Sequence, residues 1–325
     1  MEKRSQEIDF VKGCAIFSVL LLHSLSNGVR TLIYSEVHIG QAVPIFIAVT
    51  FYLSFINLQK NSNYIKYWFS KRRIISLFRR IVFPVFAMNI AMIVIMLVCG
   101  YKYLIINLLR SGGGGPGSYY LWIYLQLWFL MPVIYKMFNA KHKYQGIVLI
   151  LLASILCNIL CSVLKIPFNI YRLLCVRYLF LSAIAWFWIY RKQFNRFLIY
   201  GLSVCSLVYL EFIAGSDSQP FVYEGGWSSQ NYPVYFWTYS LIIGLLYLYS
   251  KIKHLKIRRL ICWMGYNSWE IFVMQMFVFG CFRPRMFIFS STELNQVVYV
   301  FVTLTASIIP IVIYEKVKIK LLNNK

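Results

Sequence analysis

Residues 8–24 read IDFVKGCAIFSVLLLHS, an apolar run in which only Asp9, Lys12 and His23 can carry a charge. Its length is close to the roughly 20 residues that an α-helix needs to cross the hydrocarbon core of a membrane. No small-residue cleavage site follows it, and Lys12 and His23 lie inside it. We therefore interpret the run as a retained membrane helix and not as a signal peptide.

Apolar runs of similar length recur along the whole chain. Because these runs are continuously apolar and do not alternate over strands of about ten residues, a transmembrane β-barrel is disfavoured. The sequence predicts an all-α polytopic membrane protein, with residues 1–325 forming one transmembrane domain and no separate soluble domain. The ten predicted transmembrane helices are residues 8–27, 41–57, 81–100, 119–138, 147–164, 173–190, 197–214, 232–250, 261–282 and 295–314.

The composition agrees with a membrane protein, since 60% of the 325 residues are hydrophobic and only 13% are charged. These values are far from the average of soluble proteins and exclude a cytosolic enzyme. The 33 Lys and Arg against 10 Asp and Glu give a net charge of +23. Most of the basic residues fall in alternate loops, as in the cytoplasmic loops of membrane proteins. Both termini are therefore predicted to be cytoplasmic, and a nucleic-acid partner loses its main support.

The eight cysteines lie almost entirely within apolar runs and lack the spacing of metal ligands. We interpret them as small core side chains, and we expect no metal and no permanently bound cofactor. A disulfide between Cys99 and Cys281, near two predicted outer helix ends, is the alternative. The glycine-rich residues 112–117 are either a flexible connector or a backbone surface beside a site.

Lys12 and His23 share one face of the first helix. Their spacing of eleven residues leaves them about 20° apart around the helix and ~16 Å apart along its axis. Asp9 lies one turn before Lys12 and can pair with it. A snorkelling lysine and a histidine bonded to a neighbouring helix are the structural alternatives. The shared face favours a cavity with a cation at its cytoplasmic end and a base deeper in.

Three further ionisable residues fall inside predicted spans, where charge is costly, so each is a functional candidate. Glu211 or Glu270 can orient and polarise His23, and Arg177 can stabilise an oxyanion or an acidic substrate group. The alternative is that two of these residues form an ion pair with a purely structural role.

Residues 71–84 read KRRIISLFRRIVFP and combine clustered arginines with an apolar helix start. Anionic lipid headgroups attract such a run at the cytoplasmic face. The alternative is phosphate binding, because the guanidinium group can grip a phosphate with two hydrogen bonds. The candidates for this role are Arg73, Arg79 and Arg80.

These motifs, in this order, resemble the acyltransferase 3 family of integral membrane enzymes, which modify polysaccharides, lipids and related acceptors. Arg4, Ile8, Asp9, Lys12, Gly13 and His23 are similar to the opening motif of the family. The family's second, third, fourth and late helices are similar to residues 41–55, 71–84, 119–135 and 265–275. Two departures stand out: Gln275 occupies the place where many members have a second histidine, and Thr50 or Phe51 replaces a glycine of the second helix.

The resemblance implies transfer of an acyl group, usually acetyl, from cytoplasmic acetyl-CoA as co-substrate to a hydroxyl of a glycan or lipid-linked sugar. It implies that His23 is the general base, or else carries the acetyl group itself. It also implies donor binding by Lys12, with Asp9 beside it, and substrate contact by Tyr120 in the aromatic fourth helix. The CoA phosphates would be held by Lys12, Arg73, Arg79 and Arg80.

We expect a multi-pass protein of the cytoplasmic (inner) membrane, of bacterial origin, with membrane lipid around it. We expect no extracytoplasmic domain, so the protein would deliver the acyl group directly or rely on a separate protein. The competing class is a transporter or flippase of a sugar or lipid intermediate, which usually has repeat symmetry or paired broken helices; neither is found. A polytopic glycosyltransferase is the third and least favoured class of function. Such an enzyme is expected to have a pair of acidic residues in the loop between the first two helices, where this sequence has Glu36 alone.

Overall fold

The computed structural model describes residues 5–99, 113–139, 143–212, 222–223, 228–281 and 292–323, and these ranges contain helices and turns but no β-strand. The all-α class is therefore confirmed. The helices are α1 Gln6–Ser24, α2 Asn27–Leu32, α3 Ala42–Gln59, α4 Tyr64–Trp68, α5 Lys71–Leu77, α6 Phe83–Val98, α8 Tyr120–Phe138, α9 Lys143–Val163, α10 Phe168–Tyr171, α11 Leu181–Ile189, α12 Arg196–Phe212, α13 Tyr235–Lys251, α14 Leu255–Tyr266, α15 Ser268–Cys281 and α16 Thr292–Asn323.

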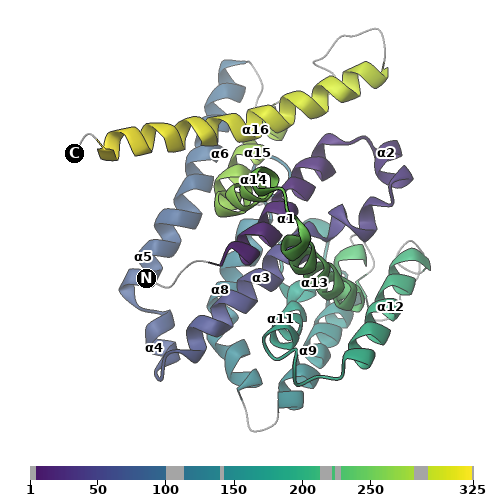
Figure 1. The fold of residues 1–325 in the computed structure, drawn as a ribbon. Coiled ribbons are helices and arrows are strands. Elements are labelled where there is room, and N and C mark those ends of the chain that lie inside the picture. Colours follow the sequence, from purple (N-terminus) through teal and green to yellow (C-terminus); the bar gives the residue numbers. More distant parts are fainter. Residues whose placement is uncertain are drawn as a thin grey trace.

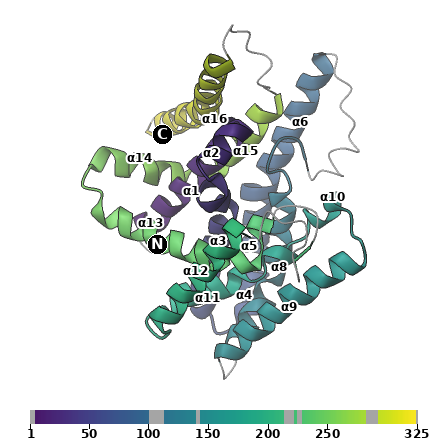
Figure 2. The same ribbon diagram turned by 90° about the vertical axis from the view of Figure 1, so that its right-hand side faces the viewer.

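Helix α1 lies at the centre of the molecule, with α3, α13, α14, α15 and α16 around it (Figure 1). Figure 2 shows α8, α9, α11 and α12 together below this group. Among its neighbours, α1 packs most extensively against α14. Two glycines make it possible: a side chain at Gly13 would overlap the backbone carbonyl of Ile261, and one at Gly265 would overlap that of Asp9. Small residues allow such close approach between membrane helices.

Within the described residues, five helical segments are long and apolar enough to cross a membrane. Helix α1 is long enough, but Glu7, Asp9 and Lys12 interrupt its apolar character. Helices α12 and α13 have 17 residues each and α15 has 14, so they are shorter than a typical span. The multi-pass character is thus supported, and the count of ten spans stays a prediction. The five segments are Ser35–Gln59, Lys71–Val98, Tyr120–Phe138, Tyr144–Val163 and Leu294–Val317.

Two of the ten predicted spans differ from single helices. The ninth, residues 261–282, breaks at Asn267, which ends α14 before α15 begins. The sixth, residues 173–190, begins as a loop whose backbone bonds to the side chain of Gln126: this amide donates to the carbonyl of Leu173 at 2.6 Å and accepts from the Cys175 N–H at 3.0 Å. Only the nine residues of α11 are α-helical there. Average hydropathy did not reveal either break, because apolar residues dominate both segments despite Arg177 in one and Asn267 and Glu270 in the other.

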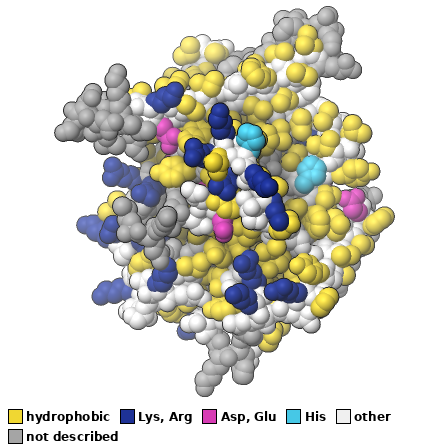
Figure 3. Space-filling view, viewed as in Figure 1, with side chains coloured by type: hydrophobic (Ala, Val, Ile, Leu, Met, Phe, Trp, Pro, Cys, Tyr) yellow, Lys and Arg dark blue, Asp and Glu magenta, His cyan; other side chains and the backbone are white. Residues whose placement is uncertain are grey.

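The ends of the helices fall into two groups on opposite sides. On the predicted cytoplasmic side, Tyr249 OH donates to Gln6 Oε1 at 3.2 Å, and Gln59 Nε2 donates to Tyr190 OH at 2.7 Å. On the other side, side-chain amides bond to backbone carbonyls, in the pairs Gln41–Ser229 at 2.9 Å and Gln296–Ser24 at 2.6 Å. On the face seen in Figure 3, Lys and Arg side chains lie on the left and in the centre, with few acidic ones among them, and the right-hand part is mostly hydrophobic. The alternation of ten helices across the membrane and the cytoplasmic location of both termini stay predictions.

The topology gives a labelling prediction. A single cysteine at Leu32, which is 78% exposed in α2, is expected to react with an impermeant maleimide added outside the cell. One at the exposed Lys256 in α14 should react only after the membrane is opened. The native cysteines also react to some extent, so the labelling of the wild-type protein in the same cells is measured and subtracted. The reverse pattern of labelling would invert the predicted orientation.

The eight cysteines are all free thiols, so no disulfide joins Cys99 to Cys281. The described part of the glycine-rich segment, residues 113–117, is packed against α6 and α15. The Gly114 N–H donates to Asn89 Oδ1 at 2.8 Å, and Gln275 Nε2 donates to the Pro116 carbonyl at 3.1 Å. Three of its glycines have positive φ angles, which other residues rarely adopt. The segment therefore presents an ordered backbone surface beside α15.

Candidate active site

Helix α1 carries the first group of candidate residues. Lys12 Nζ lies 4.0 Å from Asp9 Oδ1, and Asp9 is buried while Lys12 is half-buried. The structure thus contains the ion pair that the i, i+3 spacing predicts. His23 is half-buried further along α1, and its ring centroid lies 5.9 Å from that of Phe279 in α15.

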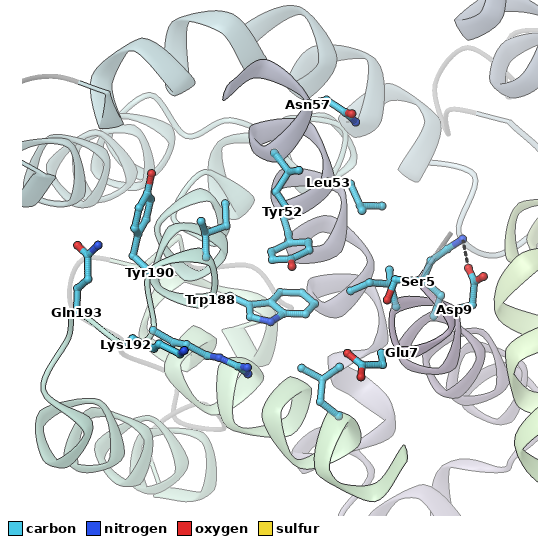
Figure 4. A pocket seen from close by; sticks show the side chains of 16 residues that line it. Ser5, Glu7, Asp9, Tyr52, Leu53, Asn57, Trp188, Tyr190, Lys192 and Gln193 are labelled. Carbon is cyan, nitrogen blue, oxygen red and sulfur yellow. Dashed lines mark ion pairs between the residues drawn. The ribbon is translucent and has the colours of Figure 1, made fainter. Parts of the chain in front are cut away.

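A wide chamber of about 870 Å³ opens beside the beginning of α1. Its walls come from α1, α3, α13, the end of α11 and the turn that follows α11 (Figure 4). This volume falls within the range of roughly 300–1,000 Å³ that is usual for small-molecule sites. The chamber has a mixed polar and apolar lining, and its charged residues are Glu7, Asp9, Lys12, Arg191 and Lys192.

A second chamber of about 270 Å³, called the narrow chamber, lies further along α1, between α1, α3, α8, α15 and the π-helical turn Phe78–Val82. Its walls are mainly apolar and aromatic, and they include Trp269 and Phe272. Lys12 and Leu53 line both chambers, so the two cavities meet at this pair. The polar side chains of the narrow chamber are Lys12, Thr50, Ser54, Tyr120, Tyr124 and Ser268.

His23 lies on α1 just beyond the end of the narrow chamber. Val19 lines this chamber, and His23 is one helical turn, about 6 Å, beyond it on nearly the same face. Helix α15 runs in parallel beside α1: Ser268 lines the chamber with Lys12, and Phe279, eleven residues later, contacts His23. His23 itself is not among the residues that line the described chamber. The series Lys12, Val19 and His23 therefore follows one side of α1 from the junction of the chambers outward.

The structure does not bring the two predicted acids to His23. Glu270 is exposed in the first turn of α15, nine residues before Phe279, which corresponds to about 13 Å along the helix. Glu211 is exposed near the end of α12. No contact of either carboxylate with His23 is present among the described residues, so their role in catalysis stays a prediction.

The three predicted phosphate-binding arginines occupy different environments. Arg73 is half-buried: its guanidinium group lies 4.1 Å from the ring centroid of Trp68, and its Nη1 donates to Tyr67 OH at 2.8 Å. Arg79 and Arg80 are exposed on the π-helical turn Phe78–Val82. None of the three lines either chamber, although Ile81 of the same turn lines the narrow one.

Tyr120 and Arg177 have different surroundings. Tyr120 lines the narrow chamber, and its contact with a substrate stays a prediction. Arg177 is fully buried, and its guanidinium group lies 4.5 Å from the ring centroid of Tyr178 and 5.4 Å from that of Tyr119. The Arg177 carbonyl accepts a hydrogen bond from Tyr235 OH at 2.8 Å. Arg177 is thus built into an aromatic cluster, outside the lining of both chambers.

Sequence reasoning missed several residues of the two chambers. Leu53 and Trp269 are apolar or aromatic residues within apolar helices, so nothing in the sequence distinguishes them from core residues. Tyr124 is one turn after Tyr120 and could have been found from that spacing. In the sequence, Arg191 and Lys192 are explained by the charge bias of cytoplasmic loops alone. Only the tertiary structure places them at the wide chamber.

Comparison with known proteins gives one match. The model of the acyltransferase 3 family, described as an acyltransferase domain, matches residues 5–315, which is nearly the whole chain. No curated protein and no solved structure matches the chain. The matched region includes every residue of the two chambers.

Proposed function

Because this chain belongs to the acyltransferase 3 family, we propose that it moves an acyl group, acetyl in particular, from cytoplasmic acyl-CoA to a hydroxyl of a cell-surface polysaccharide, oligosaccharide or lipid-linked sugar. The observation that carries this proposal is the pair of chambers that meet at Lys12 and Leu53. A large donor with a thin thioester arm needs a roomy site joined to a narrow one.

The wide chamber suits the donor, since it has room for a nucleotide-sized ligand and basic residues for its phosphates. The narrow chamber suits the thioester arm and the acceptor hydroxyl. Its wall of Tyr120, Tyr124 and Trp269 is aromatic, and apolar faces with polar tips can hold a sugar ring while bonding to its hydroxyls. Lys12 lies at the junction, where the arm passes.

In the proposed reaction, the oxygen of the acceptor hydroxyl attacks the thioester carbonyl while His23 takes the hydroxyl proton. The carbon–sulfur bond then breaks, and the leaving thiolate is protonated by His23. The products are an ester and free CoA, and no other reactant is needed. His23 suits this exchange because a neutral imidazole can accept a proton near physiological pH and return it.

Mass spectrometry of surface glycans and lipid-linked precursors tests the proposal. Cells with the wild-type protein should contain an acceptor that carries an acetyl-sized mass increment, and this increment should be absent from cells without the protein. Cells expressing an unrelated polytopic protein at the same membrane level serve as the control. Accumulation of a precursor in cells that lack the protein, without any acyl mass shift, would contradict the proposal and favour a transporter.

A further inference from the structure

The two basic residues at the mouth of the wide chamber have a defined structural setting. Arg191 and Lys192 form part of the turn between α11 and α12, and both side chains are exposed while lining the chamber. We propose that this Arg191–Lys192 turn binds the phosphate groups of the nucleotide-bearing acyl donor. The proposal rests on the proposed function, because it assigns the donor a position within the same site.

The turn is held in place on both sides. Its backbone is closed by a hydrogen bond from the Gln193 N–H to the Tyr190 carbonyl at 2.8 Å. The Tyr190 hydroxyl accepts a hydrogen bond from Gln59 of α3, and Phe194 packs against Phe187 with ring centroids 4.5 Å apart. These contacts fix the backbone of the turn, so both basic side chains start from a defined place beside the chamber and less order has to be gained on binding a ligand.

The charges of the chamber favour an anion at this turn. Of the two carboxylates in the lining, Asp9 is paired with Lys12 at the inner end. Glu7 is the other, and the same lining holds two further cations, Arg191 and Lys192, so positive charges outnumber negative ones. A guanidinium group beside an ammonium group suits a phosphate or pyrophosphate, because the guanidinium can donate two parallel hydrogen bonds.

An aromatic wall stands in the same chamber. The rings of Tyr52 in α3 and Trp188 in α11 are stacked, with centroids 4.0 Å apart and an angle of 23° between their planes. Both line the chamber, and Figure 4 shows them between the first turn of α1 and the labelled Lys192. Trp188 is only 5% exposed, so the half-buried Tyr52 is the ring of this pair that offers a surface on which a flat nucleic-acid base can stack. A wall of this kind favours a nucleotide over the phosphate of a lipid headgroup, which has no ring to stack.

The position of the turn agrees with the path of the donor. With its phosphates at Arg191 and Lys192, the donor would extend its arm across the wide chamber to Lys12 and Leu53, where the narrow chamber begins. The arginines of residues 71–80 offer no comparable path. Arg79 and Arg80 line neither chamber, and Arg73 is engaged by Trp68 and Tyr67.

The test is the affinity of the purified full-length protein for CoA and for acetyl-pantetheine, which lacks the nucleotide and its phosphates. The double variant Arg191→Gln, Lys192→Gln should bind CoA at least about tenfold more weakly, because it loses charge-assisted hydrogen bonds. Its preference for CoA over acetyl-pantetheine should shrink by the same factor. The matched control is Lys71→Gln, Arg72→Gln, which removes the same charge from exposed residues outside both chambers.

Three results would overturn the proposal. One is unchanged CoA affinity in the Arg191, Lys192 variant, and another is an equal loss in the control, which would indicate a diffuse charge effect. The third is loss of CoA binding when the wild-type protein is moved from neutral lipid nanodiscs into phosphatidylglycerol nanodiscs, which would indicate a lipid-headgroup site. If the wild-type protein binds no CoA at all, the proposed function fails as well. If the wild-type protein binds CoA and the double variant binds it equally well, only the role of the Arg191–Lys192 turn is wrong and the proposed function stands.

Discussion

Replacing His23 with alanine is expected to lower the rate of acyl transfer by about 10²- to 10⁴-fold, the usual contribution of a general acid–base group. The side chain follows Lys12 and Val19 on one side of α1, immediately beyond the narrow chamber. Loss of the imidazole removes the proposed proton acceptor, while the contact with Phe279 is a minor part of the packing. Transfer of labelled acetyl from acetyl-CoA, measured in membranes at equal protein level, gives the comparison.

The control for this experiment is His254→Ala, which removes an exposed histidine that lines neither chamber. A second variant, His23→Gln, keeps a polar side chain of similar size but cannot exchange a proton near neutral pH. Activity restored by glutamine would show that His23 acts through packing or hydrogen bonding. Activity of His23→Ala within about threefold of the wild type would remove His23 from the mechanism altogether, since a general base contributes far more.

The second large effect is expected at Gly265 in α14. An alanine methyl group there would overlap the backbone carbonyl of Asp9, so α1 and α14 would have to separate. Overpacking typically costs about 1–3 kcal/mol, and we expect the upper end or more because the obstacle is backbone and cannot rotate away. The variant should show a clearly lower midpoint of thermal unfolding in detergent, together with a lower yield of monodisperse protein.

The matched control is Gly244→Ala in α13, where an added methyl group meets nothing within 4 Å. Alanine is a better helix former than glycine by up to about 1 kcal/mol, so this control should be as stable as the wild type or slightly more stable. Equal stability of Gly265→Ala and Gly244→Ala would mean that α1 and α14 do not pack as closely as the structure has them. The predicted importance of Gly265 would then be wrong.

The sequence by itself determined the class of the protein. Continuous apolar runs fix helices in a membrane, because the lipid interior leaves no partners for unpaired backbone groups. The periodicity of a helix places Lys12 and His23 on one face without any tertiary information, and the pairing of Asp9 with Lys12 follows from the same spacing. These residues also indicate the family, and the match over residues 5–315 confirms it.

Only the tertiary structure decided which ionisable residues face a cavity. Hydropathy weights Glu211, Glu270, Arg79 and Arg191 alike, because it counts charges and does not see neighbours. Packing leaves the first three outside both chambers and brings Arg191 to the wide one. Glycine shows the same limit: Gly265 and Gly244 look alike in sequence, yet only Gly265 lies against a backbone carbonyl. Contacts between helices far apart in the chain depend on side-chain shape, which no local pattern encodes.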